Sequence, residues 1–96
     1  MRTIRTVTIE PVFLDGYMPD FEEMQEGKLY ISEQYTAIIH KCLCGCGEKV
    51  STPISKGMWT LIKESNGTIS LTPSIGNYQL PCKSHYIITK NKANFV

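Results

Sequence analysis

The sequence predicts a small, mainly β domain: a sheet or half-barrel of six or seven short strands with one short helix, stapled by a zinc site. Three observations carry this prediction. Apolar and polar residues alternate over Thr3–Val12, as in a half-buried strand. Asn66-Gly67 separates two β-type runs, which is the strongest short-range signal of a β-hairpin. All four cysteines fall into two short clusters, Cys42–Cys46 and Cys82–His85, that one metal ion could join.

The length of 96 residues suits one domain, and we expect residues 1–96 to form a single zinc-binding unit. A chain of this length buries only about 60–65% of its unfolded surface, so a structural metal would add needed stability. No apolar run approaches the roughly 20 residues that span a bilayer, and no signal-peptide pattern follows Arg2 and Arg5. We therefore expect a cytoplasmic protein with no membrane partner, where clustered cysteines favour metal over disulfides.

The first half of the chain predicts a strand, a helical turn and two more strands. Pro11 places the end or the edge of a sheet within Thr3–Val12. Asp20–Gly27 should form one or two helical turns, because Asp20 suits an N-cap and glycine commonly ends a helix. Lys28–Ser32 and Tyr35–Lys41 follow as β-type runs, and the former is a candidate for an exposed edge strand that could hold an extended peptide tail by strand addition.

The second half predicts a hairpin around Asn66-Gly67. Its arms are Met58–Glu64 and Thr68–Thr72, which would bury one face. That face comprises Trp59, Leu61, Ile69 and Leu71. The remaining segments are expected to be an extended run, a loop, a strand and a turn, in that order: Lys49–Ile54, Pro73–Gln79, Tyr86–Thr89 and Asn91–Asn94.

The two clusters predict a Zn²⁺ site. Zinc normally takes four ligands, and the glycines after Cys44 and Cys46 permit the tight turn that a zinc knuckle needs. The preferred set is Cys44, Cys46, Cys82 and His85. Cys42 is a rival for either Cys44 or Cys46, whereas His40 is interpreted as a strand side chain rather than a ligand.

The number of protein ligands decides what such a site does. Four ligands make a structural site, whereas three ligands and a water make a catalytic one that also needs a general base. Glu48 is the acid nearest to the cluster in sequence and is the candidate base, although a solvated turn glutamate is its simpler interpretation.

Other kinds of site receive weaker support. Ser70 and Ser74 lack an acid after Glu64 that could orient a histidine, so the sequence does not favour a serine triad. Cys42 or Cys44 could serve as an activated thiolate. Residues 49–96 carry six lysines against one glutamate, but the lysines are dispersed, so nucleic-acid binding is not favoured.

Three segments together resemble a known protein family: His40–Gly47, Gly67–Asn77 and Cys82–Tyr86, with Trp59 between the first two. The family consists of small bacterial proteins of unknown function. Its members are encoded beside ubiquitin-like proteins and their activating and conjugating enzymes, in phage-defence operons of the Bub type. The resemblance covers roughly residues 28–90.

The resemblance implies a peptidase that removes a ubiquitin-like modifier from its targets or matures it. It gives metal-site roles to Cys42, Cys44, Cys46, Cys82 and His85, and it implies that residues 70–77 line the site. We therefore expect a zinc-dependent, deubiquitinase-like isopeptidase whose partners are a ubiquitin-like protein or its conjugates and the activating and conjugating enzymes of the operon. The alternative is a non-catalytic zinc module that binds protein or nucleic acid.

Overall fold

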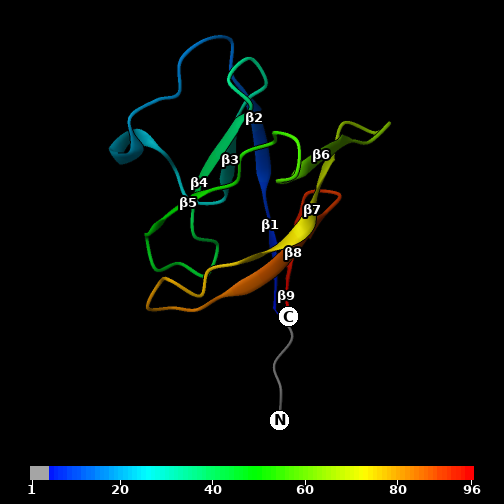
Figure 1. The fold of residues 1–96 in the computed structure, drawn as a ribbon. Helices are drawn as coiled ribbons and strands as arrows, with labels where there is room; N and C mark the ends of the chain where they lie inside the picture. The colour runs from blue at the N-terminus through cyan, green and yellow to red at the C-terminus, as the bar shows by residue number, and fades with distance from the viewer. Residues whose placement is uncertain (1–4) are drawn as a thin grey trace.

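The computed structural model describes residues 5–96, which form nine strands and one short 3-10 helix, η1 (Figure 1). In chain order the elements are β1 (Thr6–Thr8), β2 (Glu10–Phe13), η1 (Phe21–Glu23), β3 (Lys28–Ser32), β4 (Ala37–Lys41), β5 (Lys49–Ser51), β6 (Thr60–Lys63), β7 (Ile69–Gly76), β8 (His85–Thr89) and β9 (Lys92–Phe95). The mainly β prediction is therefore confirmed.

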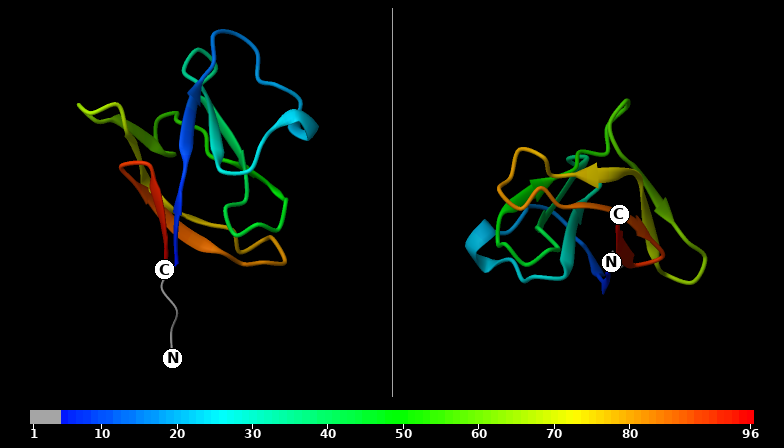
Figure 2. Two further views of the ribbon diagram at one scale, coloured as in Figure 1. Left: turned by 180° about the vertical axis from the view of Figure 1, so that it is seen from behind. Right: turned by 90° about the horizontal axis from the view of Figure 1, so that it is seen from below.

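The strands form two sheets that share the N-terminal segment. One sheet has the order β1-β9-β8-β7-β6 and the other has the order β2-β3-β4-β5. Only Ile9 separates β1 from β2, so this segment passes from one sheet into the other, as Figure 2 also shows. All pairings are antiparallel except β2 with β3.

One hydrophobic core joins the two sheets. β3, β4 and β5 contribute Leu29, Ile31, Ile38 and Val50, while β7 and β8 contribute residues such as Ile75 and Tyr86. The predicted buried face of the hairpin is confirmed, because Ile69 and Leu71 are buried and Trp59 and Leu61 pack against the same core. Cys42 and Leu43 belong to this core, which fixes the start of the cysteine turn.

Several expected elements differ from the structure. The helical turns expected over Asp20–Gly27 shrink to η1, which has no side-chain N-cap hydrogen bond. β3 lies between β2 and β4, so Lys28–Ser32 is not an edge strand. The turn expected at Asn91–Asn94 is mostly β9, and the loop expected from Pro73 begins within β7, which continues to Gly76. The expected strand at Thr3 and Ile4 lies outside the described residues.

Within residues 5–96, a helix with the length and apolar character needed to cross a bilayer is absent. The prediction of one domain over residues 1–96 stays a prediction.

Candidate functional site

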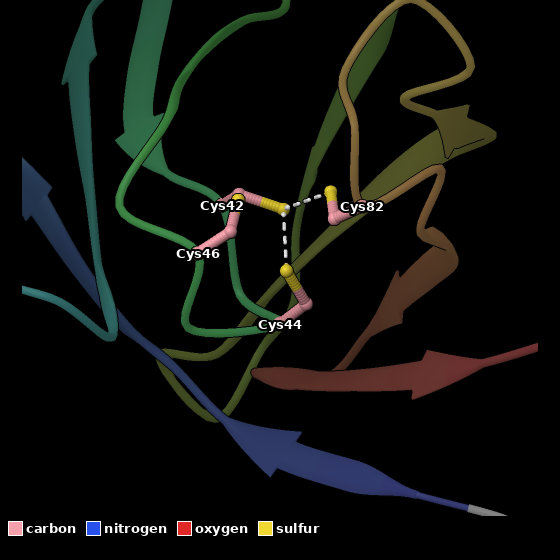
Figure 3. A group of neighbouring side chains, drawn as sticks. All are labelled: Cys42, Cys44, Cys46 and Cys82. Atoms are coloured by element: carbon pink, nitrogen blue, oxygen red, sulfur yellow. Dashed lines mark hydrogen bonds between the residues drawn. The ribbon is translucent and has the colours of Figure 1, made fainter.

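The structure gathers the four cysteines at one end of the molecule. Cys42 follows β4, Cys44 and Cys46 lie in the turn before β5, and Cys82 lies in the loop before β8. The four sulfur atoms all lie within 4.8 Å of one another. Figure 3 shows the Cys42 sulfur between those of Cys44 and Cys82, at 3.4 and 3.8 Å. Residues 40 positions apart in sequence therefore meet in one cluster.

The β4–β5 turn brings the first three sulfurs together. The Cys42 amide donates to the Glu48 carbonyl at 2.8 Å, and the Gly45 amide donates to the Cys42 carbonyl at 3.1 Å. Gly45 and Gly47 have φ angles of 94° and 83°, in the left-handed region that glycine adopts without steric cost. The sequence prediction that these glycines shape the turn is consistent with this geometry.

The donor chemistry of the cluster fits zinc. Tetrahedral zinc with Zn–S bonds of about 2.3 Å requires sulfur–sulfur distances of about 3.8 Å, which the cluster already approaches. Hydrogen bonds from the Ser84 side chain and backbone lower the pKa of Cys82 to about 6, whereas burial raises the pKa of Cys44 to about 12. A cation would favour the thiolate form of every sulfur, which is the form that binds zinc.

The sulfur group differs from the preferred ligand set by one member. Cys44, Cys46 and Cys82 belong to it, and Cys42 stands where His85 was expected. Glu48 is exposed, and its backbone carbonyl rather than its carboxylate supports the turn. His40 is fully buried and contacts the Tyr86 hydroxyl at 2.8 Å through Nε2, and burial lowers the pKa of His40 to about 4, so its ring is neutral at pH 7.

One face of the β7–β8 hairpin supports the cysteines. The Ser84 hydroxyl lies 3.0 Å from the Cys42 sulfur and 3.4 Å from the Cys82 sulfur. Asn77 is 2% exposed, and its amide nitrogen donates to the Ser84 hydroxyl at 3.1 Å and to the Tyr86 hydroxyl at 3.4 Å. These contacts orient the cysteine sulfurs, as the hydrogen-bond partners of metal ligands commonly do.

The opposite face of the same hairpin carries a different constellation. His85 Nε2 lies 2.7 Å from Ser74 Oγ, and His85 Nδ1 lies 3.0 Å from the Tyr78 hydroxyl. Ser74 and His85 are half-buried, whereas Tyr78 is exposed. A serine hydroxyl on one ring nitrogen and an acceptor on the other is the arrangement that nucleophilic catalysis by serine uses.

Strand alternation explains this second arrangement. Gly76 pairs directly with His85, so the imidazole projects from the face of β7 that carries Ser74, and Tyr78 contacts the same ring from the turn after β7. Gly76 carries no side chain between them, which leaves the ring free to reach both neighbours. The register also shifts between Leu71 and Ile75, so Ser74 lies in an irregular stretch of β7. Such bulges often re-aim a side chain beside an active site.

Sequence reasoning missed the pairing of Ser74 with His85. It looked for an acid to orient the histidine, whereas the partner of Nδ1 is the hydroxyl of Tyr78. It also assigned His85 to the metal site because of its spacing from Cys82. The two-residue spacing of Ser74 and Gly76, which places them on one face of a strand, is the signal that could have located Ser74, once residues 73–76 are recognised as a strand.

The family comparison matches this constellation. Residues 15–96 match the family model described as bacterial ubiquitination-like system serine protease (BubE). The chain belongs to the BubE family. The resemblance to Bub-type peptidases is therefore confirmed, and the chain has a protease-type role within a ubiquitination-like system. No curated protein and no solved structure matches the chain.

The family description directs attention to a serine. Within residues 5–96, the two histidines have different partners: His40 contacts Tyr86, and His85 contacts Ser74. Other serines serve the fold, since Ser70 donates to Glu64 and Ser84 contacts the cysteine sulfurs. Among residues 5–96, Ser74 is thus the serine whose hydroxyl contacts a histidine ring.

Proposed function

We propose that this BubE-family protein is a serine peptidase in which Ser74 is the nucleophile and His85 is the general base. The 2.7 Å contact between Ser74 Oγ and His85 Nε2 carries the proposal. For Nε2 to accept the serine proton, the proton of the neutral ring must be on Nδ1, where it can be donated to the Tyr78 hydroxyl at 3.0 Å. Tyr78 therefore acts as a positioning residue that fixes the productive tautomer.

The reaction follows from these positions. Ser74 Oγ attacks the scissile carbonyl while His85 takes the hydroxyl proton, which gives a tetrahedral intermediate. His85 then returns that proton to the leaving amine as the C–N bond breaks, leaving an ester on Ser74. Water then attacks the ester while His85 takes its proton, the bond between the acyl carbon and Ser74 Oγ breaks to release the acid product, and His85 returns the proton to Ser74 Oγ. No proton is gained or lost by the protein over the cycle.

Zinc has a structural part in this proposal. Cys42, Cys44, Cys46 and Cys82 would hold it as a set of four thiolates, which leaves no ligand position for a water. When bound, the ion would supply folding energy rather than an activated water. Asn77 and Ser84 then connect the zinc side of the hairpin with the strands that carry Ser74 and His85. Removal of zinc would accordingly lower the stability of the fold, and activity would fall because the fold is lost.

The proposed substrate is a ubiquitin-like modifier joined to a target, or its precursor with residues beyond the mature C-terminus. The family's place in a ubiquitination-like system supports this class of substrate. The activating and conjugating enzymes of that system are the further partners that we propose.

The deciding experiment combines a substitution with active-site labelling. Ser74→Ala should lose at least about a thousandfold in kcat on a modifier conjugate, while zinc content and melting temperature are kept. A fluorophosphonate should add to Ser74 in the wild-type chain, as located by peptide mass mapping. Ser65→Ala is the matched control, because Ser65 is exposed in the hairpin turn.

Two results would overturn the proposal. Cleavage that survives Ser74→Ala but fails in Glu48→Gln would favour a metal-dependent mechanism with Glu48 as base. Absence of both cleavage and labelling, in a folded zinc-bound protein, would favour the alternative of a non-catalytic binding module.

A further inference from the structure

We infer that an extended peptide, the part of the substrate on the acyl side of the scissile bond, binds as an added strand in the groove between β5 and the C-terminal end of β7. This inference rests on the proposed role of Ser74. The two strands belong to different sheets, and each presents an open edge to the same hollow.

The open edge of β5 follows from its pairing. β5 is the last strand of its sheet and pairs only with β4 among the described strands. The Cys42 amide donates to the Glu48 carbonyl, and the Thr52 amide donates to the Ile38 carbonyl, so even-numbered residues of this segment bond to β4. Alternation then turns the backbone N–H and C=O groups of Lys49 and Ser51 away from β4.

The open edge of β7 lies beside Ser74. Pairing between β6 and β7 ends at Thr60 and Thr72, so β6 does not accompany β7 as far as Gly76. The Asn77 amide donates to the Ser84 carbonyl, which makes that pair a hydrogen-bonded one. The neighbouring pair, Gly76 with His85, must then be of the other type, and the Gly76 backbone N–H and C=O point away from β8.

Both edges border one cavity of about 250 Å³. Lys49 and Ser51 line it from the β5 side, and Gly76 and Asn77 line it from the β7 side. Thr52 and Trp59 also line it, and the Thr52 hydroxyl and the Trp59 indole N–H are buried without a hydrogen-bond partner. Unpartnered polar groups beside a hollow with open main-chain edges suit a polar, extended occupant.

The position of His85 decides which part of the substrate lies there. His85 must protonate the leaving amine, so the leaving group has to pass on the β8 side of Ser74. The groove lies on the opposite edge of β7. The acyl part therefore extends into the groove, where its main chain can bond to Gly76 and to Ser51.

Two experiments on the full chain test this inference. The first uses aminocoumarin amides of acetylated alanine peptides with one to four residues on the acyl side, each also made with N-methylated amides. We expect kcat/KM to rise about tenfold or more with length, and N-methylation to remove the gain, because each added residue can form main-chain hydrogen bonds that N-methylation deletes. An equal gain from extending a peptide on the leaving side would overturn the inference.

The second experiment removes one edge donor. Ser51→Pro deletes the outward N–H and should raise KM for the four-residue reporter about tenfold with a smaller change in kcat. Lys63→Pro is the matched control, because it removes an outward N–H from the edge strand β6, away from the groove. An unchanged KM in folded Ser51→Pro would contradict the groove assignment.

These results separate the two proposals. Ser74-dependent cleavage that ignores acyl length and N-methylation would reject the groove and keep the serine peptidase. Cleavage of the reporters and of a modifier conjugate that is unaffected by Ser74→Ala would reject the nucleophile itself, and with it the groove.

Discussion

Gly76 lies directly against the ring of Tyr78: a Cβ on Gly76 would be 2.6 Å from Tyr78 Cε2, closer than real contacts allow. The missing side chain therefore sets where the Tyr78 ring lies, and so whether its hydroxyl reaches His85 Nδ1. Gly76→Ala should displace the ring and lower kcat about tenfold, the cost of one hydrogen bond that orients the base. The measurement is kcat on a modifier conjugate, with circular dichroism as a check on the fold.

A double variant provides the control for this prediction. If Gly76→Ala acts by moving Tyr78, it should have little further effect in a chain that already carries Tyr78→Phe, because the two changes remove the same contact. Fully additive losses would mean that Gly76 affects the reaction by another route.

Tyr78→Phe tests the orienting hydroxyl alone. The ring stays but the acceptor for Nδ1–H is lost, so the imidazole no longer favours the tautomer in which Nε2 accepts the Ser74 proton. We expect kcat to fall about tenfold with KM nearly unchanged. Nitrogen chemical shifts of the His85 ring should show an increased share of the other tautomer. Tyr17→Phe is the control, since Tyr17 is 87% exposed; an equal loss of kcat there would argue against an orienting role for Tyr78.

Metal removal should act on the fold before it acts on the chemistry. The four sulfurs lie within 4.8 Å of one another, so one bound ion would link the segments that carry them, and loss of the ion would break this link. A strong chelator should lower the melting temperature by at least about 10 °C, because structural zinc contributes several kcal/mol and each kcal/mol moves a domain of this size about 4–8 °C. The measurement is differential scanning fluorimetry with zinc counted per chain.

Substitution of a ligand should reproduce this loss without chelator. Cys82→Ser is expected to lose zinc and to melt at the temperature of the chelated wild type. His85→Ala is the matched comparison: it should keep its zinc and lose cleavage. The opposite pattern, with zinc lost in His85→Ala and kept in Cys42→Ala, would restore the ligand set that the sequence favoured.

Local chemistry made much of this molecule predictable. Alternation and the Asn66-Gly67 turn indicated the strands and the hairpin, because both act over a few residues. The cysteine spacing likewise indicated the cluster. The pairing of Ser74 with His85 depends instead on the register of β7 with β8, including a bulge that no local pattern specifies. The short spacing between Cys82 and His85 also misled, because it suggested that His85 joins the cysteines. In the structure Ser84 contacts the Cys82 sulfur, whereas His85 points to the opposite face and contacts Ser74.

Asn77 joins the β7–β8 hairpin to the cysteine cluster, and its loss should weaken the fold. Its amide nitrogen reaches the Cys42 sulfur at 3.6 Å as well as the hydroxyls of Ser84 and Tyr86, and its backbone N–H bonds to the Ser84 carbonyl. Asn77→Ala would remove the amide that donates to the Ser84 and Tyr86 hydroxyls and leave a cavity beside them, so the free energy of unfolding should fall by about 1–3 kcal/mol. Urea unfolding of the zinc-bound protein measures this change, with the exposed Gln34→Ala as control. Because Asn77 follows β7 directly, kcat should fall too; a stable but inactive variant would mean that Asn77 positions Ser74 rather than holding the fold.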